Sequence, residues 1–118
     1  GMTGGQMAPT TMIGQRTTSS KDGRILADSG ENFDVVKTMR GLAIAYLART
    51  SVTNPANVAK TKKYVRKALE KQRDCKGFSL VEVLVPCPTN WGMTPPKSME
   101  YINDVMTKQY ELGEFIDR

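Results

Sequence analysis

Two apolar runs along the chain predict buried strands. Residues 42–49 are mostly aliphatic and end in polar positions, and residues 78–85 are rich in β-branched side chains. Pro86 ends the second run, whose one acidic residue, Glu82, stands out in an apolar setting. Each run has the length of a strand rather than a helix.

Three segments with apolar residues at helical spacing predict helices. The first covers residues 32–40 with Asn32 as its cap, and the second covers residues 54–74 and begins at Asn54-Pro55. A third begins at Thr94-Pro95 by the same logic. The side chains expected to face the core are Val58, Thr61, Val65, Ala68 and Leu69 in the second helix, and Met99, Ile102, Val105 and Met106 in the third.

The alternation of helices and strands predicts an α/β fold, with a parallel sheet and helices on both of its faces. Residues 1–31 are glycine-rich, lack any period and are expected to form loops, whereas residues 32–118 form the α/β segment and end in an irregular tail over 109–118. Two strands are too few for a stable sheet. Residues 1–118 are therefore expected to form a single, incomplete domain of a larger fold.

The composition excludes several kinds of active site. The chain has no histidine and two cysteines, so it cannot hold a Ser/His/Asp triad, a histidine-based zinc site or a disulfide scaffold. Any catalysis therefore depends on a cofactor or on another chain. No apolar run approaches the ~20 residues of a membrane span, and a reduced, cytoplasmic setting is expected.

The positive charge is concentrated in one predicted helix. The net charge is +5, and residues 60–76 carry eight lysines and arginines against Glu70 and Asp74, which is 8 − 2 = +6. This pattern fits either a nucleic-acid-binding face or the solvated side of an amphipathic helix. The second interpretation is favoured because only Tyr64 could stack on a base.

Two segments could carry chemistry. The run Thr3-Gly4-Gly5-Gln6 could turn several backbone N–H groups toward a phosphate, although a flexible terminus has the same composition. Cys87 stands between two prolines after the second strand, where ligands of α/β proteins gather. Its thiolate could bind an iron–sulfur cluster whose other ligands lie elsewhere, or it could be a buried, inert cysteine.

The segments Met2–Thr11 (MTGGQMAPTT) and Gly77–Gly92 (GFSLVEVLVPCPTNWG), with Ala48-Arg49 between them, closely resemble the β subunit of 2-oxoacid:ferredoxin oxidoreductases. Within this family, the sequence is most similar to the enzymes that act on 2-oxoglutarate or 2-oxoisovalerate. The resemblance covers essentially the whole chain. It implies the C-terminal part of a thiamine-diphosphate-binding fold, in an enzyme that decarboxylates a 2-oxoacid oxidatively with coenzyme A to acyl-CoA, CO2 and reduced ferredoxin.

The resemblance also implies roles for particular residues. The cofactor-binding residues would be Met2, Thr3, Gly4, Gly5 and Gln6. Cys87 would supply one ligand of a 4Fe–4S cluster, whereas Cys75 matches no ligand. The family's Gly-Asp-Gly signature and its asparagine-containing segment, which hold Mg2+, and its CxxC cysteines are missing from this sequence. The chain alone is therefore expected to bind neither thiamine diphosphate nor a cluster, and to be inactive.

The expected partners are the α and other subunits of the oxidoreductase, ferredoxin and coenzyme A. Two alternatives stay open. A half-sheet that exposes apolar surface would form a homodimer or a strand-exchanged oligomer when isolated. A non-catalytic module could instead bind nucleic acid through residues 60–76.

Overall fold

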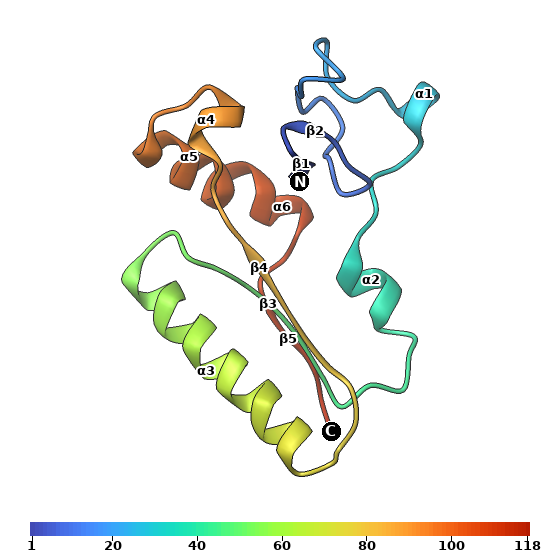
Figure 1. The fold of residues 1–118 in the computed structure, drawn as a ribbon, viewed down its shortest axis with the longest axis vertical. Helices are drawn as coiled ribbons and strands as arrows, with labels where there is room; N and C mark the ends of the chain where they lie inside the picture. Colours follow the sequence, from blue (N-terminus) through green and yellow to red (C-terminus); the bar gives the residue numbers. More distant parts are fainter.

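The computed structural model describes all 118 residues as a three-stranded sheet with helices on its two faces and a loop-rich region at one end (Figure 1). The strand order is β4-β3-β5. Strand β3 (Tyr46–Ser51) runs parallel to β4 (Ser79–Leu84) and antiparallel to β5 (Gly113–Asp117). The prediction of an α/β fold with two parallel strands is confirmed, but the sheet as a whole is mixed.

Strand β5 corrects the prediction of an irregular tail over residues 109–118. The segment is too short to show a clear period of its own, and it becomes a strand by pairing with the buried β3, where Ile116 lies opposite Leu47. Phe115 and Ile116 then pack against the cluster formed by Val36, Ile44 and Leu47. Tertiary pairing, rather than local pattern, therefore determines this element.

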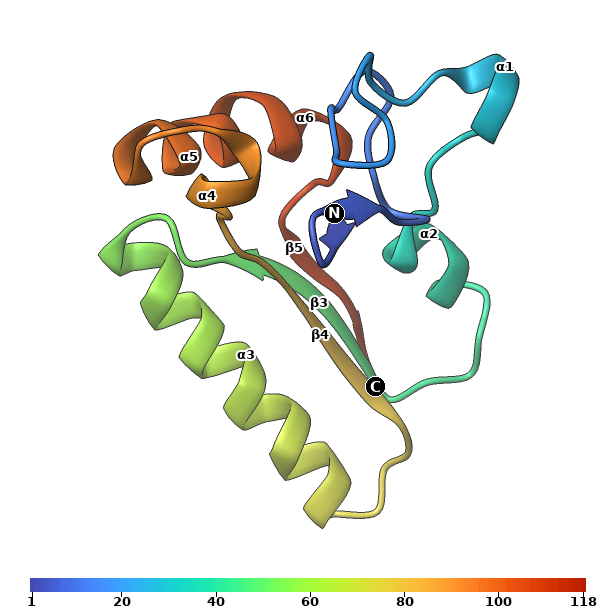
Figure 2. The ribbon, with the colours of Figure 1, turned by 45° about the horizontal axis from the view of Figure 1, so that its top comes forward.

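Helix α3 (Pro55–Arg73) covers one face of the sheet, and its bounds follow the prediction closely (Figure 2). The side chain of Asn54 accepts a hydrogen bond from the backbone N–H of Asn57 at 2.8 Å, and Pro55 occupies the first turn. The chain leaves the helix through Cys75, with a φ of 53°, and Gly77, with a φ of 120°.

Helix α2 (Val35–Met39) packs against β3 on the opposite face, so the expectation of helices on both faces is met. Its cap is Asp34, not Asn32 as predicted. The Asp34 carboxylate accepts hydrogen bonds from the N–H groups of Val36 at 2.9 Å and Lys37 at 3.2 Å. Asn32 instead donates to the Tyr110 hydroxyl, because the sequence offers two suitable caps and tertiary contacts decide between them.

The third predicted helix is divided into α5 (Pro95–Tyr101), a π-helical turn η1 (Ile102–Met106) and α6 (Thr107–Gln109). A short helix α4 (Pro88–Trp91) precedes it. Ile102 and Met106 are buried as predicted, but Met99 and Val105 are 37% and 40% exposed. The π-helical turn interrupts the period of 3.6 residues, so regular helical spacing does not give the buried face of this segment correctly.

Residues 1–31 contain a short hairpin of β1 (Met2–Thr3) and β2 (Gln6–Met7), one turn of helix α1 (Leu26–Ser29) and loops. Arg24, 6% exposed, holds these loops together. Its guanidinium donates six hydrogen bonds, to the carbonyls of Ala8, Pro9, Thr11, Ser29, Gly30 and Glu31. None of the helices is both long enough and apolar enough to cross a membrane.

Candidate functional site

A cavity of about 280 Å³ lies at the carboxyl end of β4, beneath the N-terminal hairpin. Met2, Gly4, Gly5 and Cys87 all line it. The glycine-rich start and the Cys87 loop therefore meet at one edge of the sheet, and Figure 2 shows the hairpin close to the carboxyl ends of the strands.

The other two predicted site residues, Thr3 and Gln6, are exposed and do not line the cavity. They lie opposite each other in the hairpin. The turn between them, Gly4-Gly5, is the part of the segment that reaches the cavity wall. The structure thus brings together three of the five residues proposed from the sequence for cofactor binding.

Gly5 allows the hairpin to approach the Cys87 loop closely. Its φ is +78°, in the left-handed region, and a Cβ at this position would lie 3.0 Å from Oδ1 of Asn90. The Gly5 carbonyl accepts two hydrogen bonds from Thr18, from the backbone N–H at 2.9 Å and from the hydroxyl at 3.0 Å. Both the conformation and the contact therefore require glycine.

Cys87 is half-buried and precedes α4, which begins at Pro88. The side-chain amide of Asn90 donates a hydrogen bond to its Sγ at 3.2 Å. Cys75 is exposed after the far end of α3 and takes no part in this site. No group of three or more cysteine or acidic side chains is close enough together to hold a metal ion.

A buried ion-pair cluster beside the cavity was not predicted from the sequence. Arg49, only 2% exposed, donates from Nε to Glu82 at 2.6 Å and from a terminal nitrogen to Asp34 at 2.5 Å. Its guanidinium also lies 5.0 Å from the ring centre of Tyr110. Arg49 and Glu82 are paired in the register of the parallel strands β3 and β4. The sequence signal for this ion pair was an arginine in one apolar run and a glutamate in the other.

The arginine keeps the Asp34 carboxylate charged. Burial alone would raise the pKa of Asp34, but hydrogen bonds from Arg49 and from the backbone of α2 outweigh it and lower the pKa below its usual value. Glu82 and Tyr110 both reach the cavity lining. One wall of the cavity thus carries the Glu82 carboxylate, which Arg49 holds in position, and another wall is formed by the Gly4-Gly5 turn.

These residues fit one part of a site for a phosphate-bearing cofactor. The turn at Gly4 and Gly5, with φ angles of +56° and +78°, is a two-residue hairpin turn without side chains, so a phosphate could approach its bare backbone closely in the cavity that both glycines line. The cavity lies just below the roughly 300–1,000 Å³ of ligand pockets, and its carboxylate, Glu82, is already paired with Arg49. The residues of this chain therefore do not form a magnesium site, and a single cysteine does not form a cluster site.

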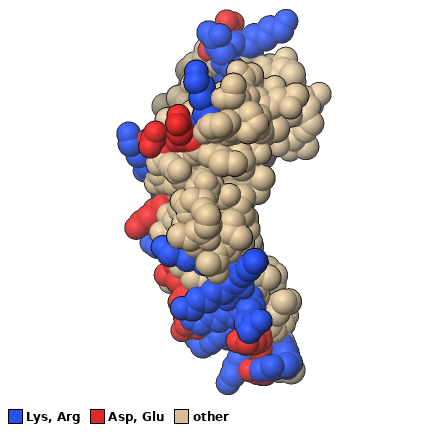
Figure 3. Space-filling view, turned by 90° about the vertical axis from the view of Figure 1, so that its left-hand side faces the viewer, with Lys and Arg blue, Asp and Glu red and all other residues tan.

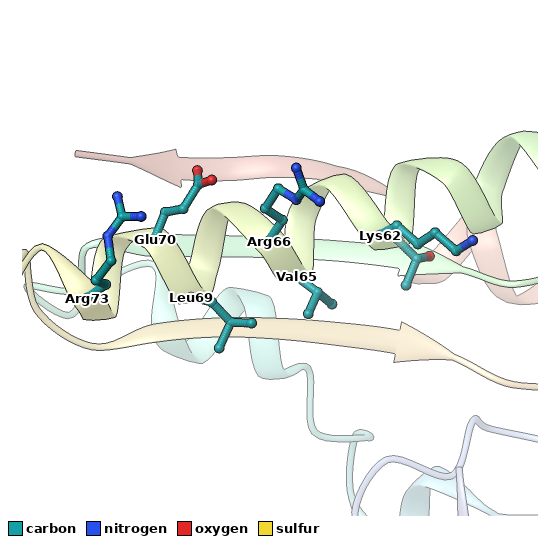
Figure 4. Close-up of a pocket in the computed structure, with 7 residues that line it drawn as sticks. Lys62, Val65, Arg66, Leu69, Glu70 and Arg73 are labelled. Atoms are coloured by element: carbon teal, nitrogen blue, oxygen red, sulfur yellow. The ribbon is translucent and has the colours of Figure 1, made fainter.

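A second, shallow hollow lies on the outer side of α3, lined by Val65 and Leu69 (Figure 4). Both residues were predicted to be buried, but they are 40% and 64% exposed. They project from α3 on the side of β4, whose outer edge has no partner strand. The sheet is too narrow on that side to cover them, which explains the difference from the prediction.

Basic side chains gather over the same helix (Figure 3). Two of them are paired with β5: Lys67 contacts Glu114 at 3.0 Å and also Asp117, and Lys71 contacts Asp117 at 2.9 Å. The acidic end of the chain therefore partly neutralises the basic helix, which supports a structural role for this face.

The chain is similar over its whole length to subunit VorA of the ketoisovalerate oxidoreductase of Methanothermobacter marburgensis (39% identity) and of Methanothermobacter thermautotrophicus (36%). It is 32% identical over 88% of its length to subunit KorB of the 2-oxoglutarate synthase of Archaeoglobus fulgidus. These relatives are subunits of enzymes named for a 2-oxoacid. The similarity agrees with the family resemblance carried by residues 2–11 and 77–92.

The chain spans 25% of the length of the two VorA subunits and 35% of the KorB subunit. No family model matches it, and no solved structure does. The similarity therefore supports the general family of 2-oxoacid oxidoreductases, while the role of the chain within such an enzyme rests on the cavity described above.

Proposed function

We propose that this chain is the C-terminal part of the thiamine-diphosphate-binding β subunit of a 2-oxoacid:ferredoxin oxidoreductase. The enzyme would decarboxylate its 2-oxoacid oxidatively in the cytoplasm and transfer the acyl group to coenzyme A and the electrons to ferredoxin. The observation that carries the proposal is the cavity in which Met2, Gly4, Gly5 and Cys87 come together. These residues belong to the two segments that resemble the family, which are far apart in the sequence.

The role of the chain in cofactor binding is to supply one wall of the site. The Gly4-Gly5 turn would approach the diphosphate, and Met2 would lie beside the cofactor. Thr3 and Gln6 would join the site through contacts with residues outside this chain. When bound, thiamine diphosphate supplies the carbon nucleophile that attacks the 2-oxo group. The Mg2+ ligands would come from outside these 118 residues, and the chain alone is inactive.

Cys87 would be one ligand of a 4Fe–4S cluster whose remaining cysteines lie outside the chain. The hydrogen bond from Asn90 to its sulfur supports this role, because donors to a ligating sulfur stabilise its negative charge and adjust the potential of a cluster. The partners would then be the α and other subunits, with ferredoxin as the electron acceptor. The substrate would be 2-oxoisovalerate or 2-oxoglutarate, the acids for which the three relatives described above are named.

The substitution Gly5→Ala tests the proposal in the enzyme assembled with its companion subunits. An added Cβ would meet Asn90 and strain the turn, so the affinity for thiamine diphosphate with Mg2+ is expected to fall at least about tenfold, which corresponds to roughly 1.4 kcal/mol. Calorimetric titration measures this affinity. The matched control is Gly41→Ala, where a Cβ meets nothing within 4 Å and φ is not in the left-handed region. Equal affinity in both variants would contradict the proposed site.

A second proposal concerns the chain in isolation. The free edge of β4 is flanked by Val65 and Leu69, and Phe78 and Val85 at the two ends of this strand are 55% and 59% exposed. An unpaired edge beside apolar side chains favours pairing with another strand. We propose that the isolated chain forms a homodimer or a strand-exchanged oligomer through this edge.

A further inference from the structure

Glu82 is the only charged side chain in the lining of the cavity at the carboxyl end of β4. Successive side chains of a strand point to opposite faces of the sheet, so Glu82 leaves β4 on the same face as Leu84. Leu84 packs with Met106 and Tyr110, which both line the cavity, whereas α3 covers the other face of the sheet (Figure 2). The side chain of Glu82 is 21% exposed, so it has accessible surface on the cavity side.

One oxygen of the Glu82 carboxylate has no partner within the chain. Arg49 donates from Nε to Oε2 at 2.6 Å, and no group donates to Oε1. Arg49 also pairs with Asp34, so one guanidinium serves two carboxylates and the three groups keep a formal charge of +1 − 2 = −1. The Gly1 amino group also lines the cavity, but burial lowers its pKa to about 6, so most of it is uncharged at pH 7. The Glu82 carboxylate therefore lacks a full counter-charge.

The chemistry of the walls indicates which part of a ligand Glu82 contacts. A carboxylate repels a phosphate and accepts hydrogen bonds from N–H groups. Leu84, Met106 and Tyr110 supply an apolar and aromatic surface on the same face of β4, and such a surface suits a flat ring. The Gly4-Gly5 turn has neither a charge nor a side chain, so the phosphate of a ligand is expected there rather than beside Glu82.

We infer that Glu82 accepts a hydrogen bond, through Oε1, from the amino-bearing ring of the ligand that occupies this cavity. The inference rests on the proposed function: in thiamine diphosphate the amino group belongs to the pyrimidine ring, which the second ring of the cofactor separates from the diphosphate. Glu82 then binds the pyrimidine end, and the Gly4-Gly5 turn approaches the diphosphate end. Arg49 keeps the carboxylate in place without lining the cavity itself.

A comparison of two cofactors tests this contact in the enzyme assembled with its companion subunits. Oxythiamine diphosphate has an oxygen in place of the amino group of thiamine diphosphate and is otherwise the same. An oxygen that faces a carboxylate is repelled, so calorimetric titration in the presence of Mg2+ should show at least about tenfold weaker binding of oxythiamine diphosphate to the wild type. Glu82→Gln has no charge and carries an amide that donates to the oxygen of the analogue, so this preference should fall to within about twofold.

The matched control for this variant is Glu114→Gln. Glu114 is likewise a strand glutamate paired with a basic side chain, Lys67, but it does not line the cavity, so its variant should keep the preference of the wild type. Equal binding of the two cofactors by the wild type, or an unchanged preference in Glu82→Gln, would overturn the inference. If Glu82→Gln did not assemble, the comparison in the wild type would still decide. Failure of the wild type to bind thiamine diphosphate at all would refute the proposed function and, with it, this inference.

Discussion

Replacing Arg24 should destabilise the whole N-terminal region. Its terminal nitrogens donate six hydrogen bonds of 2.9–3.3 Å to carbonyls on both sides of the loop, and no acidic group pairs with it. Three of these carbonyls follow the hairpin, in Ala8, Pro9 and Thr11, and the other three are in residues 29–31, so a single side chain joins the segment after β2 to the end of α1. Residues 1–31 contain little regular structure, so few helix or strand hydrogen bonds keep these loops in place.

The magnitude follows from the number of donors. One terminal nitrogen of Arg24 serves three of the carbonyls and the other serves the remaining three, so the single ammonium group of Arg24→Lys leaves about three of the six without a charged donor. Hydrogen bonds to charged groups contribute roughly 1.5–3 kcal/mol each, but water and a relaxed loop recover part of this. We expect a loss of about 2–4 kcal/mol in the free energy of unfolding, and a greater loss for Arg24→Met. Such a loss is large against the roughly 5–15 kcal/mol of a typical domain.

Urea unfolding followed by circular dichroism measures this change, and hydrogen exchange locates it. Faster exchange should appear in residues 8–31, whereas β3 and β4 should keep their protection apart from the global loss. Arg66→Lys, an exposed substitution in α3, is the matched control and should stay within about 0.5 kcal/mol of the wild type. If Arg24→Lys also stayed within this range, Arg24 would not be the residue that orders the loops.

Two further predictions concern the ion pairs and the free edge. Asp34 has a lowered pKa in the fold, so its contribution to stability is present above roughly pH 4 and is lost as the pH falls through its folded-state pKa. Asp34→Asn should therefore destabilise the chain at pH 7, and this difference should shrink as the pH is lowered through the folded-state pKa of Asp34, so a difference that does not change with pH would refute this. For the edge, Val65→Lys with Leu69→Lys should give a monomer in light scattering where the wild type is a dimer or larger, while Lys60→Gln with Lys63→Gln should not. A monomeric wild type would contradict self-association through this face.

The elements predicted well are those whose information is local. Asn54 and Pro55 determine the start of α3 through contacts within one turn, and the two apolar runs become β3 and β4 within a few residues of the expected bounds. The candidate site was found because two distinctive segments, at residues 2–6 and 86–92, suggested a common location. In the structure the separate N-terminal hairpin packs at the carboxyl end of β4, and residues of both segments line one cavity.

The features that were missed depend on contacts between distant residues. Strand β5 forms because β3 offers it a partner, and the Arg49 cluster joins residues from α2, β3 and β4. The structural role of Arg24 was not predicted, since its acceptors are backbone carbonyls that no residue type reveals. Val65 and Leu69 had the right helical spacing for burial, but helical spacing does not show how wide a sheet lies beneath the helix.

The most direct test of the central claim is a pair of calorimetric titrations with thiamine diphosphate and Mg2+, one on the isolated chain and one on the enzyme assembled with its companion subunits. If the Gly4-Gly5 turn and the Cys87 loop form one wall of a shared cofactor site, the assembled enzyme binds with a dissociation constant in the micromolar range or below, and the isolated chain gives no measurable heat. Micromolar binding by the isolated chain, or no binding by the assembled enzyme, would contradict the account.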